Sequence, residues 1–107
     1  MYGTIMRARV KPDRRQGFES FMSEMTPGAD TGFIGVQVGW EDTDSNRVVL
    51  VVVFKDKESY VRNADDPHTD EMYRKQLEFL EGEPEWIDVN WAQYFGGASG
   101  QGPTAGA

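Results

Sequence analysis

Seven successive apolar residues, five of them valine, run from Val48 to Phe54. Valine favours strands, and the polar residues 44–46 before the run are typical of a turn, so we expect a strand over Arg47–Phe54. Alternate residues of a strand point to opposite faces of its sheet, and this run therefore places apolar side chains on both faces. Both faces of the sheet must be covered at this strand.

Shorter patterns predict three further strands. Alternation indicates strands over Tyr2–Val10 and Phe33–Glu41, with a polar hairpin loop over 41–46 leading into the valine-rich strand. A fourth strand is expected over Trp86–Phe95. Its apolar face carries Ile87, Val89, Trp91 and Phe95, and its more polar face carries Asp88 and Asn90.

Helices are expected between these strands. The first follows Asp13, which we expect to cap it in a capping box with Gln16. Its apolar stripe consists of Phe18, Phe21, Met22 and Met25, spaced i, i+3, i+4 and i+7. A short helix follows the cap Asp56, and another begins at Pro67, a residue favoured in a first helical turn. We expect that helix to end at Gly82.

The order strand, helix, strand, strand, helix pair, strand predicts an α+β fold. It corresponds to a ferredoxin-like antiparallel four-stranded sheet with helices on one face. The other face then carries an apolar set: Val49, Val51, Val53, Ile87, Val89 and Trp91. Two copies packed sheet against sheet bury this set in both chains, so we expect a homodimer through that face.

Composition and charge exclude several classes of protein. The net charge is −7, and the basic residues cluster only between Arg7 and Arg15, which argues against a nucleic-acid-binding sheet. No apolar run reaches the ~20 residues of a membrane span, and no secretory signal is recognisable. The absence of cysteine is typical of a cytoplasmic protein. We expect one domain over 1–95 and a glycine-rich tail over 96–107.

Five segments together resemble a known family: residues 2–12, 32–33, 51–60, 63–68 and 84–86. They are similar to the antibiotic biosynthesis monooxygenase-like family of dimeric α/β-barrel proteins, over residues 1 to about 95. The resemblance implies a homodimer with facing sheets and a pocket in each subunit, between the sheet and the helices after the third strand. The family includes cofactor-independent quinone-forming monooxygenases, haem-degrading enzymes and isomerase-like proteins.

The resemblance also argues against haem degradation. The haem-degrading branch uses an asparagine on the first strand, a tryptophan on the helix after the third strand and a histidine ten residues later. The aligned positions here hold Met6, Asn63 and Tyr73, and none of them matches.

Three polar residues are candidates for catalysis, each with a structural alternative. His68, the only histidine, can act as a general base near neutral pH or lie exposed in a first helical turn. Asn63 can donate a hydrogen bond to a substrate carbonyl or to dioxygen, or cap local backbone. Tyr73 can donate its hydroxyl to a ligand or serve as a core residue.

The ligand is expected between the apolar sheet face and the segment 60–73. The substrate-binding candidates are Met6, Val38, Leu50, Tyr60 and Trp86. We expect no metal site, because acidic residues such as Asp66 and Asp70 fall at helix starts, where they favour the helix dipole. No phosphate loop or nucleophile elbow is present, and we expect no cofactor.

The sequence therefore supports two functions on one scaffold. The first is cofactor-independent monooxygenation of a small aromatic or polyketide-like substrate, in which a base removes a phenolic proton and the resulting carbanion reacts with dioxygen. The second is a non-catalytic protein that binds a small ligand or takes part in a stress response. Oxygen consumption on a panel of phenols and quinols separates the two.

Overall fold

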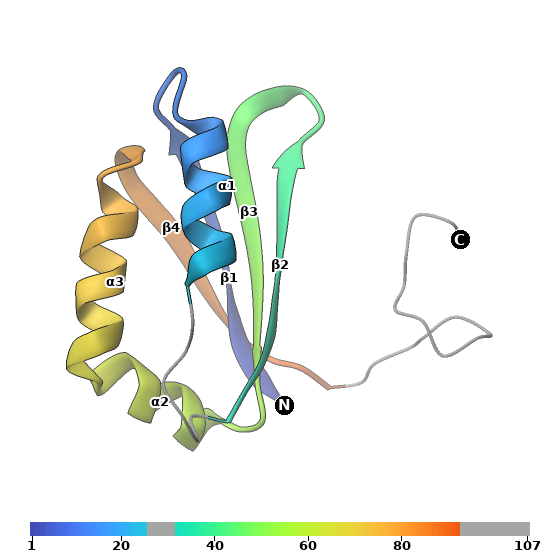
Figure 1. The fold of residues 1–107 in the computed structure, drawn as a ribbon. Helices are drawn as coiled ribbons and strands as arrows, with labels where there is room; N and C mark the ends of the chain where they lie inside the picture. The colour runs from blue at the N-terminus through green and yellow to red at the C-terminus, as the bar shows by residue number, and fades with distance from the viewer. Residues whose placement is uncertain (26–31, 93–107) are drawn as a thin grey trace.

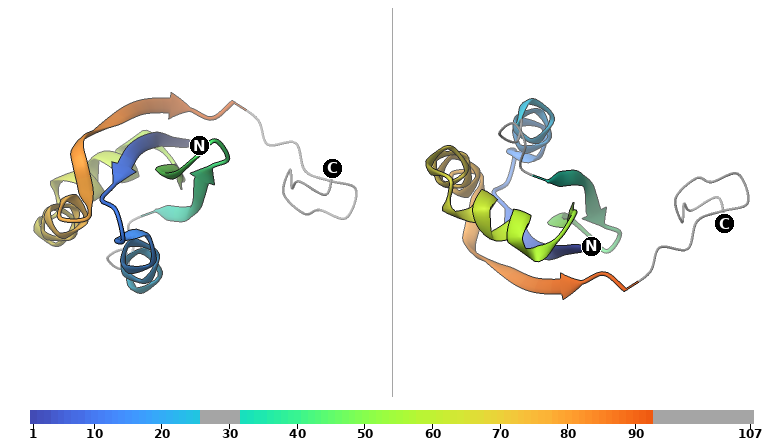
Figure 2. Two further views of the ribbon diagram at one scale, coloured as in Figure 1. Left: turned by 90° about the horizontal axis from the view of Figure 1, so that it is seen from above. Right: turned by 90° about the horizontal axis from the view of Figure 1, so that it is seen from below.

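The computed structural model describes residues 1–25 and 32–92, which form a four-stranded sheet and three helices (Figure 1). The elements in chain order are β1 (Tyr2–Val10), α1 (Arg15–Glu24), β2 (Phe33–Glu41), β3 (Asp44–Phe54), α2 (Lys57–Asp65), α3 (Pro67–Leu77) and β4 (Leu80–Asn90). The strand order is β2-β3-β1-β4 with every neighbouring pair antiparallel. The predicted ferredoxin-like α+β fold is confirmed, and the helices lie on one side of the sheet (Figure 2).

The register of the strands divides the sheet into two faces. Met6 lies opposite Leu50 and Trp86 on the face toward the helices, whereas Ile5 lies opposite Val51 and Ile87 on the face away from them. We call the face that points away from the helices the open face. Pairing of alternate residues places on it Ile5, Arg7, Arg9, Gly35, Gln37, Gly39, Val49, Val51, Val53, Ile87 and Val89. The predicted apolar character of both faces at the valine-rich strand is thereby confirmed.

The core lies under α1, at one end of the helix-facing side of the sheet. Phe18 of α1 is fully buried and packs edge to face against Trp40 and Phe79, with ring centroids 5.9 and 6.1 Å apart. The other buried members of this cluster are Met6, Ala8, Val10, Val48, Leu50 and Leu80. α1 covers only this end of the helix-facing side. α2 and α3 cover the rest of that side (Figure 1).

The start of α1 differs from the prediction. The helix is capped at Arg14 without a side-chain hydrogen bond, so the predicted capping box of Asp13 and Gln16 is wrong. Asp13 has a positive φ of 64° within a turn in which Arg14 N donates to Lys11 O at 3.1 Å. Aspartate tolerates this left-handed conformation. Asp13 therefore lies in the turn, one position before the N-cap residue Arg14.

The end of α3 and the bounds of β4 are also corrected. The helix ends at Leu77, not at Gly82, and β4 spans Leu80–Asn90 instead of Trp86–Phe95. Leu80 is buried in the core and pairs with Val10, which draws the chain into the sheet early. A register shift of β4 opposite Arg7 and Arg9 accommodates Gly82, with φ 73°, and Pro84. β4 is an edge strand, where proline costs no ladder hydrogen bond.

The hairpin between β2 and β3 is tighter than predicted, because β3 begins at Asp44 instead of Arg47. Ion pairs hold the extended part of the strand in place. Asp44 accepts from Arg9 at 2.7 Å, and Glu41 accepts from Arg7 at 3.0 Å and from Arg47 at 3.1 Å. The bond from Arg7, with that from Arg47, lowers the pKa of Glu41. The backbone N–H of Asn46, followed by the bond from Arg9, lowers the pKa of Asp44.

Some predictions fall outside the described residues. They are the position of Phe95 and the tail over 96–107. Among the helices that the structure describes, none combines the length and the apolar character needed to cross a membrane.

Candidate functional site

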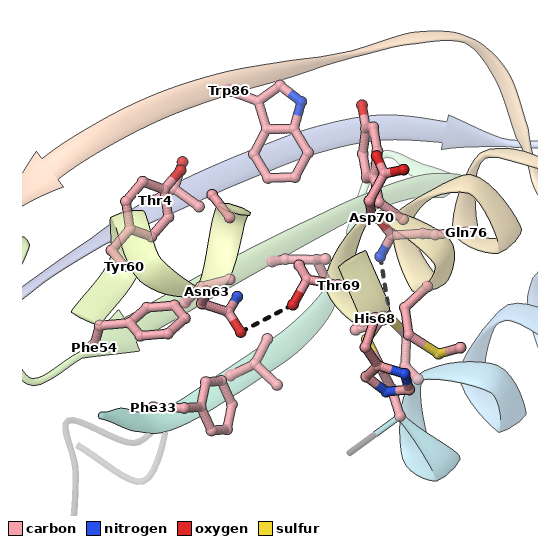
Figure 3. A pocket seen from close by; sticks show the side chains of 18 of the residues that line it. Thr4, Phe33, Phe54, Tyr60, Asn63, His68, Thr69, Asp70, Gln76 and Trp86 are labelled. Atoms are coloured by element: carbon pink, nitrogen blue, oxygen red, sulfur yellow. Dashed lines mark hydrogen bonds between the residues drawn. The ribbon is translucent and has the colours of Figure 1, made fainter. Parts of the chain in front are cut away.

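A cavity of about 570 Å³ lies between the helix-facing side of the sheet and the pair α2–α3 (Figure 3). Its apolar wall consists of Met22, Met25, Phe33, Val36, Leu50, Val52, Phe54, Ala64, Met72 and Trp86. Small-molecule sites usually have volumes of ~300–1,000 Å³ and mostly apolar walls with a few placed polar groups. The cavity is of that kind, and its polar groups come mainly from α2, α3 and β4.

The junction of α2 and α3 orients Asn63. Asp66 caps α3 by accepting from His68 N at 2.8 Å, and its own N–H donates to the backbone carbonyl of Asn63 at 3.2 Å. The side-chain Oδ1 of Asn63 accepts from Thr69 Oγ1 at 3.1 Å, the bond drawn at the centre of Figure 3. In residues 1–25 and 32–92 no acceptor pairs with Nδ2 of Asn63, so its amide hydrogens are available to a ligand.

Tyr60 and Asp88 form a hydrogen-bonded pair in the cavity wall. The Tyr60 hydroxyl donates to Asp88 Oδ1 at 3.0 Å, and its ring packs against Tyr2 and Phe54 with centroids 5.2 and 5.5 Å away. Burial, followed by the bond to Asp88, raises the pKa of Tyr60 to about 12. Tyr60 therefore keeps its proton at neutral pH and is the hydrogen-bond donor, and Asp88 is the acceptor.

Two aromatic rings meet where α3 approaches β4. The rings of Tyr73 and Trp86 are tilted against each other with centroids 5.7 Å apart. Trp86 is 43% exposed, so much of its ring faces the cavity and solvent and not the core. In Figure 3 the indole of Trp86, from β4, and the amide of Asn63, from α2, reach the cavity from different elements.

His68 and Gln76 lie at the end of the cavity toward α1. His68 is exposed and lines the cavity in the first turn of α3. Gln76 is only 4% exposed and donates Nε2 to the thioether of Met22 at 3.3 Å. A buried amide bonded to so weak an acceptor is a polar group that a ligand can engage.

The structure brings together six of the eight residues predicted for the site. Leu50, Tyr60, Asn63, His68, Tyr73 and Trp86 all line the cavity. Met6 and Val38 do not line it, although both lie on the predicted face. Met6 is fully buried in the core beneath α1, and Val38 is 36% exposed on the edge strand β2.

Sequence reasoning missed Thr69, Gln76 and Asp88. A signal existed for Asp88, because alternation along the fourth strand places it on the same face as Trp86. Gln76 gave no signal, because glutamine is mostly exposed in proteins, whereas here it is buried on α3. No group of three His, Asp or Glu side chains suited to a metal occurs in the part of the chain that the structure describes.

The sequence profile of one family matches residues 1–75, from β1 to within two residues of the end of α3. The profile is that of the antibiotic biosynthesis monooxygenases. The chain belongs to this family. The resemblance predicted from the sequence is thereby confirmed. The matched range includes Tyr60, Asn63, His68 and Tyr73, and it excludes Gln76, Trp86 and Asp88.

Solved structures of other proteins share the fold. A Bordetella bronchiseptica protein assigned to the same family superposes with a TM-score of 0.75 at 19% identity, over 86% of this chain and 97% of that one. SnoaB, a cofactor-independent oxygenase from Streptomyces nogalater, gives 0.70 at 18%, over 86% and 93%. A conserved protein from Methanosarcina mazei gives 0.67 at 22%, over 82% and 89%. Among curated protein sequences, none matches this chain.

Proposed function

We propose that this family member is a cofactor-independent monooxygenase that oxidises a small aromatic or polyketide-like substrate with dioxygen. The observation that carries the proposal is the apolar cavity, whose hydrogen-bonding groups gather at the α2–α3 junction and on β4. The shared fold with SnoaB, a cofactor-independent oxygenase, adds support. Because a fold hosts many functions, the residues of the cavity carry the argument.

The proposed reaction turns a phenol and dioxygen into a quinone and water. A base removes the phenolic proton, and negative charge spreads to the ring carbon para to the oxygen. That carbon bonds to dioxygen and forms a ring peroxide, which takes up the proton that the base removed from the phenol. Loss of the proton from the same carbon breaks the O–O bond, so one oxygen atom remains in the new carbonyl and the other leaves as hydroxide. The hydroxide takes up the released proton and becomes water.

Three side chains have roles in this scheme. His68 is the base, since an imidazole accepts a proton near neutral pH. Asn63 donates Nδ2–H to the substrate oxygen on which negative charge develops, while Thr69 holds the opposite end of the amide. Tyr73 donates its hydroxyl from α3, beside Trp86, to the substrate or its peroxide. The apolar wall keeps water away from the carbanion.

The protein is further proposed to act as a cytoplasmic homodimer joined through the open face. Ile87 of this face is 52% exposed, and Ile34, which lines the hollow on the same side, is 57% exposed. A hollow of about 590 Å³ on the same side is lined by Val51, Val53 and Trp91 among others. A Cβ atom added at Gly35 or Gly39 meets nothing within 4 Å, so the surface of β2 is bare enough for close approach. A second copy covers these residues in both chains.

A non-catalytic ligand-binding or stress-response protein is the second candidate. It is favoured by the position of His68, which is exposed at the margin of the cavity and not enclosed with a substrate. In that case the cavity binds the same class of ligand without turnover.

Oxygen uptake distinguishes the two functions. Purified protein is mixed with a panel of phenols, naphthols and anthrone-like compounds in an oxygen electrode, and the product is examined after reaction in labelled dioxygen. We expect one labelled oxygen atom per product molecule, and loss of most turnover in Asn63→Ala and His68→Gln. Val61→Ala, an exposed position on α2 outside the cavity, is the matched control. Ligand binding without oxygen uptake across the panel contradicts the monooxygenase assignment.

A further inference from the structure

We propose that the carboxylate of Asp88 makes the cavity selective for neutral and cationic aromatic ligands that carry a hydroxyl group, and against ligands that carry a carboxylate. This inference deepens the proposed function, because it names the substrate class of the same cavity. It concerns binding alone, so it can be tested whether or not turnover occurs.

The charges that line the cavity are unbalanced. Asp70, Asp88 and His68 are its ionisable acidic and basic members besides the tyrosines, and neither lysine nor arginine lines it. Asp70 forms an ion pair with Arg74, whose guanidinium lies 3.0 Å from its carboxylate. Within residues 1–25 and 32–92, Asp88 forms no ion pair. Residues 26–31 and 93–107 contain no lysine, arginine or histidine, so no cation from them can balance Asp88.

Tyr60 fixes Asp88 as a hydrogen-bond acceptor. The tyrosine hydroxyl donates to Oδ1 at 3.0 Å and keeps its proton at neutral pH, so Asp88 is the acceptor of this bond. An ionised carboxylate has further acceptor positions on both oxygens. A ligand hydroxyl can therefore donate to Asp88 alongside Tyr60.

The same carboxylate repels an anionic ligand. A carboxylate ligand in this cavity exchanges water for apolar walls and meets a fixed negative charge with no cation beside it. Both desolvation and like charge disfavour its ionised form. A neutral hydroxyl meets no charge repulsion, and a hydrogen bond to Asp88 offsets the cost of removing it from water, whereas an ammonium group is attracted to Asp88.

Other polar groups of the cavity complement a ligand of this kind. Asn63 offers a donor to a carbonyl oxygen, and Gln76 offers an acceptor, because its amide nitrogen is directed to Met22. A dihydroxyaryl carbonyl compound matches this donor and both acceptors, whereas an aryl carboxylate can accept from Asn63 but has no hydrogen to donate to Asp88 or Gln76. Asp88, Gln76 and Trp86 lie beyond residue 75, where the match to the family profile ends, so this selectivity belongs to the part of the chain outside the match.

A matched series of naphthalenes tests the inference. Dissociation constants of 1-naphthol, 1-naphthoate and 1-naphthylmethylammonium are measured at neutral pH by calorimetry, under anaerobic conditions so that no turnover intervenes. We expect naphthoate to bind at least about tenfold more weakly than naphthol, a factor that corresponds to about 1.4 kcal/mol. Asp88→Asn should bring naphthoate close to naphthol and weaken the ammonium compound, whereas Asp88→Glu should keep the wild-type order.

The control is Asp42→Asn, which makes the same charge change in the exposed turn between β2 and β3. It should leave all three constants unchanged, since Asp42 does not line the cavity. Equal binding of naphthoate and naphthol by the wild-type protein, or an unchanged ratio in Asp88→Asn, overturns the inference even if oxygen uptake is observed. The expected ratio without any oxygen uptake leaves the inference standing and removes the monooxygenase proposal.

Discussion

The hydroxyl of Tyr60 donates a 3.0 Å hydrogen bond to Asp88 and thereby ties α2 to the edge strand β4. The two residues are 28 positions apart in the chain, and both line the cavity. Since Tyr60 also packs against Tyr2 and Phe54, this pair connects the cavity to the strands at the centre of the sheet. The charge of Asp88 is consequently held at a fixed place beside the ligand.

The Tyr60 pair predicts how stability changes at alkaline pH. The folded protein holds the Tyr60 proton more tightly than the unfolded chain, because its pKa is about 12 instead of the ordinary 10.0. Its contribution to the free energy of unfolding is complete below pH 10 and is lost as the pH rises from about 10 to about 12. Urea unfolding at several pH values should therefore show a steeper decline across this window for wild type than for Tyr60→Phe. Parallel declines of the two proteins would contradict the assignment.

The hydrogen bond from Thr69 to Asn63 predicts how changes at these two residues affect ligand binding. Asn63→Ala removes the amide and should weaken binding of a phenolic ligand by about 0.5–1.5 kcal/mol, the usual contribution of one neutral hydrogen bond. Thr69→Val leaves the amide in place but removes the group that orients it, so its effect should be smaller and of the same sign. Calorimetric titration with 1-naphthol measures both. If Thr69→Val weakens binding more than Asn63→Ala, Asn63 is not the group that contacts the ligand.

The open face predicts the effect of a charge placed on it. Val51→Lys puts an ammonium group at the centre of this face, where a partner chain would bury it without a counter-ion. Light scattering at micromolar concentration should give twice the chain mass for wild type and the single mass, or an unfolded chain, for the variant. Val61→Lys is the control, because Val61 is 44% exposed on α2. A wild-type monomer would exclude the dimer.

The residues at the three positions diagnostic of haem degradation predict that this protein leaves haem intact. Met6 is fully buried in the core, and Asn63 and Tyr73 line the cavity without the side chains that the haem-degrading branch uses there. Titration with haem and a reductant, followed by absorbance, should show no progressive loss of the Soret band. Release of iron at a rate above that of free haem would refute this prediction.

Much of the fold follows from local patterns. The valine-rich run predicts a strand apolar on both sides, and the register of β3 with β1 confirms which valines share each face. The bounds of the last strand were harder to predict, because Gly82 and Pro84 are typical of a helix end. They are instead accommodated in an edge strand by a register shift. Whether such residues end a helix or interrupt a strand depends on the burial of Leu80 and its pairing with Val10, which no local pattern contains.

The sequence predicted which face of the sheet lines the candidate site, but not which residues along each strand reach the cavity. Alternation places Met6 and Leu50 on the same side of the sheet, yet only Leu50 lines the cavity. The difference arises from where α1 crosses the sheet, which depends on the packing of Phe18 against Trp40 and Phe79. The hydrogen bond between Asp88 and Tyr60 could not be predicted without the register of β4, since Tyr60 lies on a helix distant in the sequence.

Chemical-shift mapping with 1-naphthol tests most directly whether the cavity between the sheet and α2–α3 is the ligand site. Backbone amide shifts of the isotopically labelled protein are followed as the ligand is added, with Asn63→Ala as a second sample. We predict that the largest changes lie between Tyr60 and Tyr73 and around Trp86, and that they require higher ligand concentrations in Asn63→Ala. Changes confined to Val49, Val51 and Val53 of the open face, or no changes at all, would contradict the account.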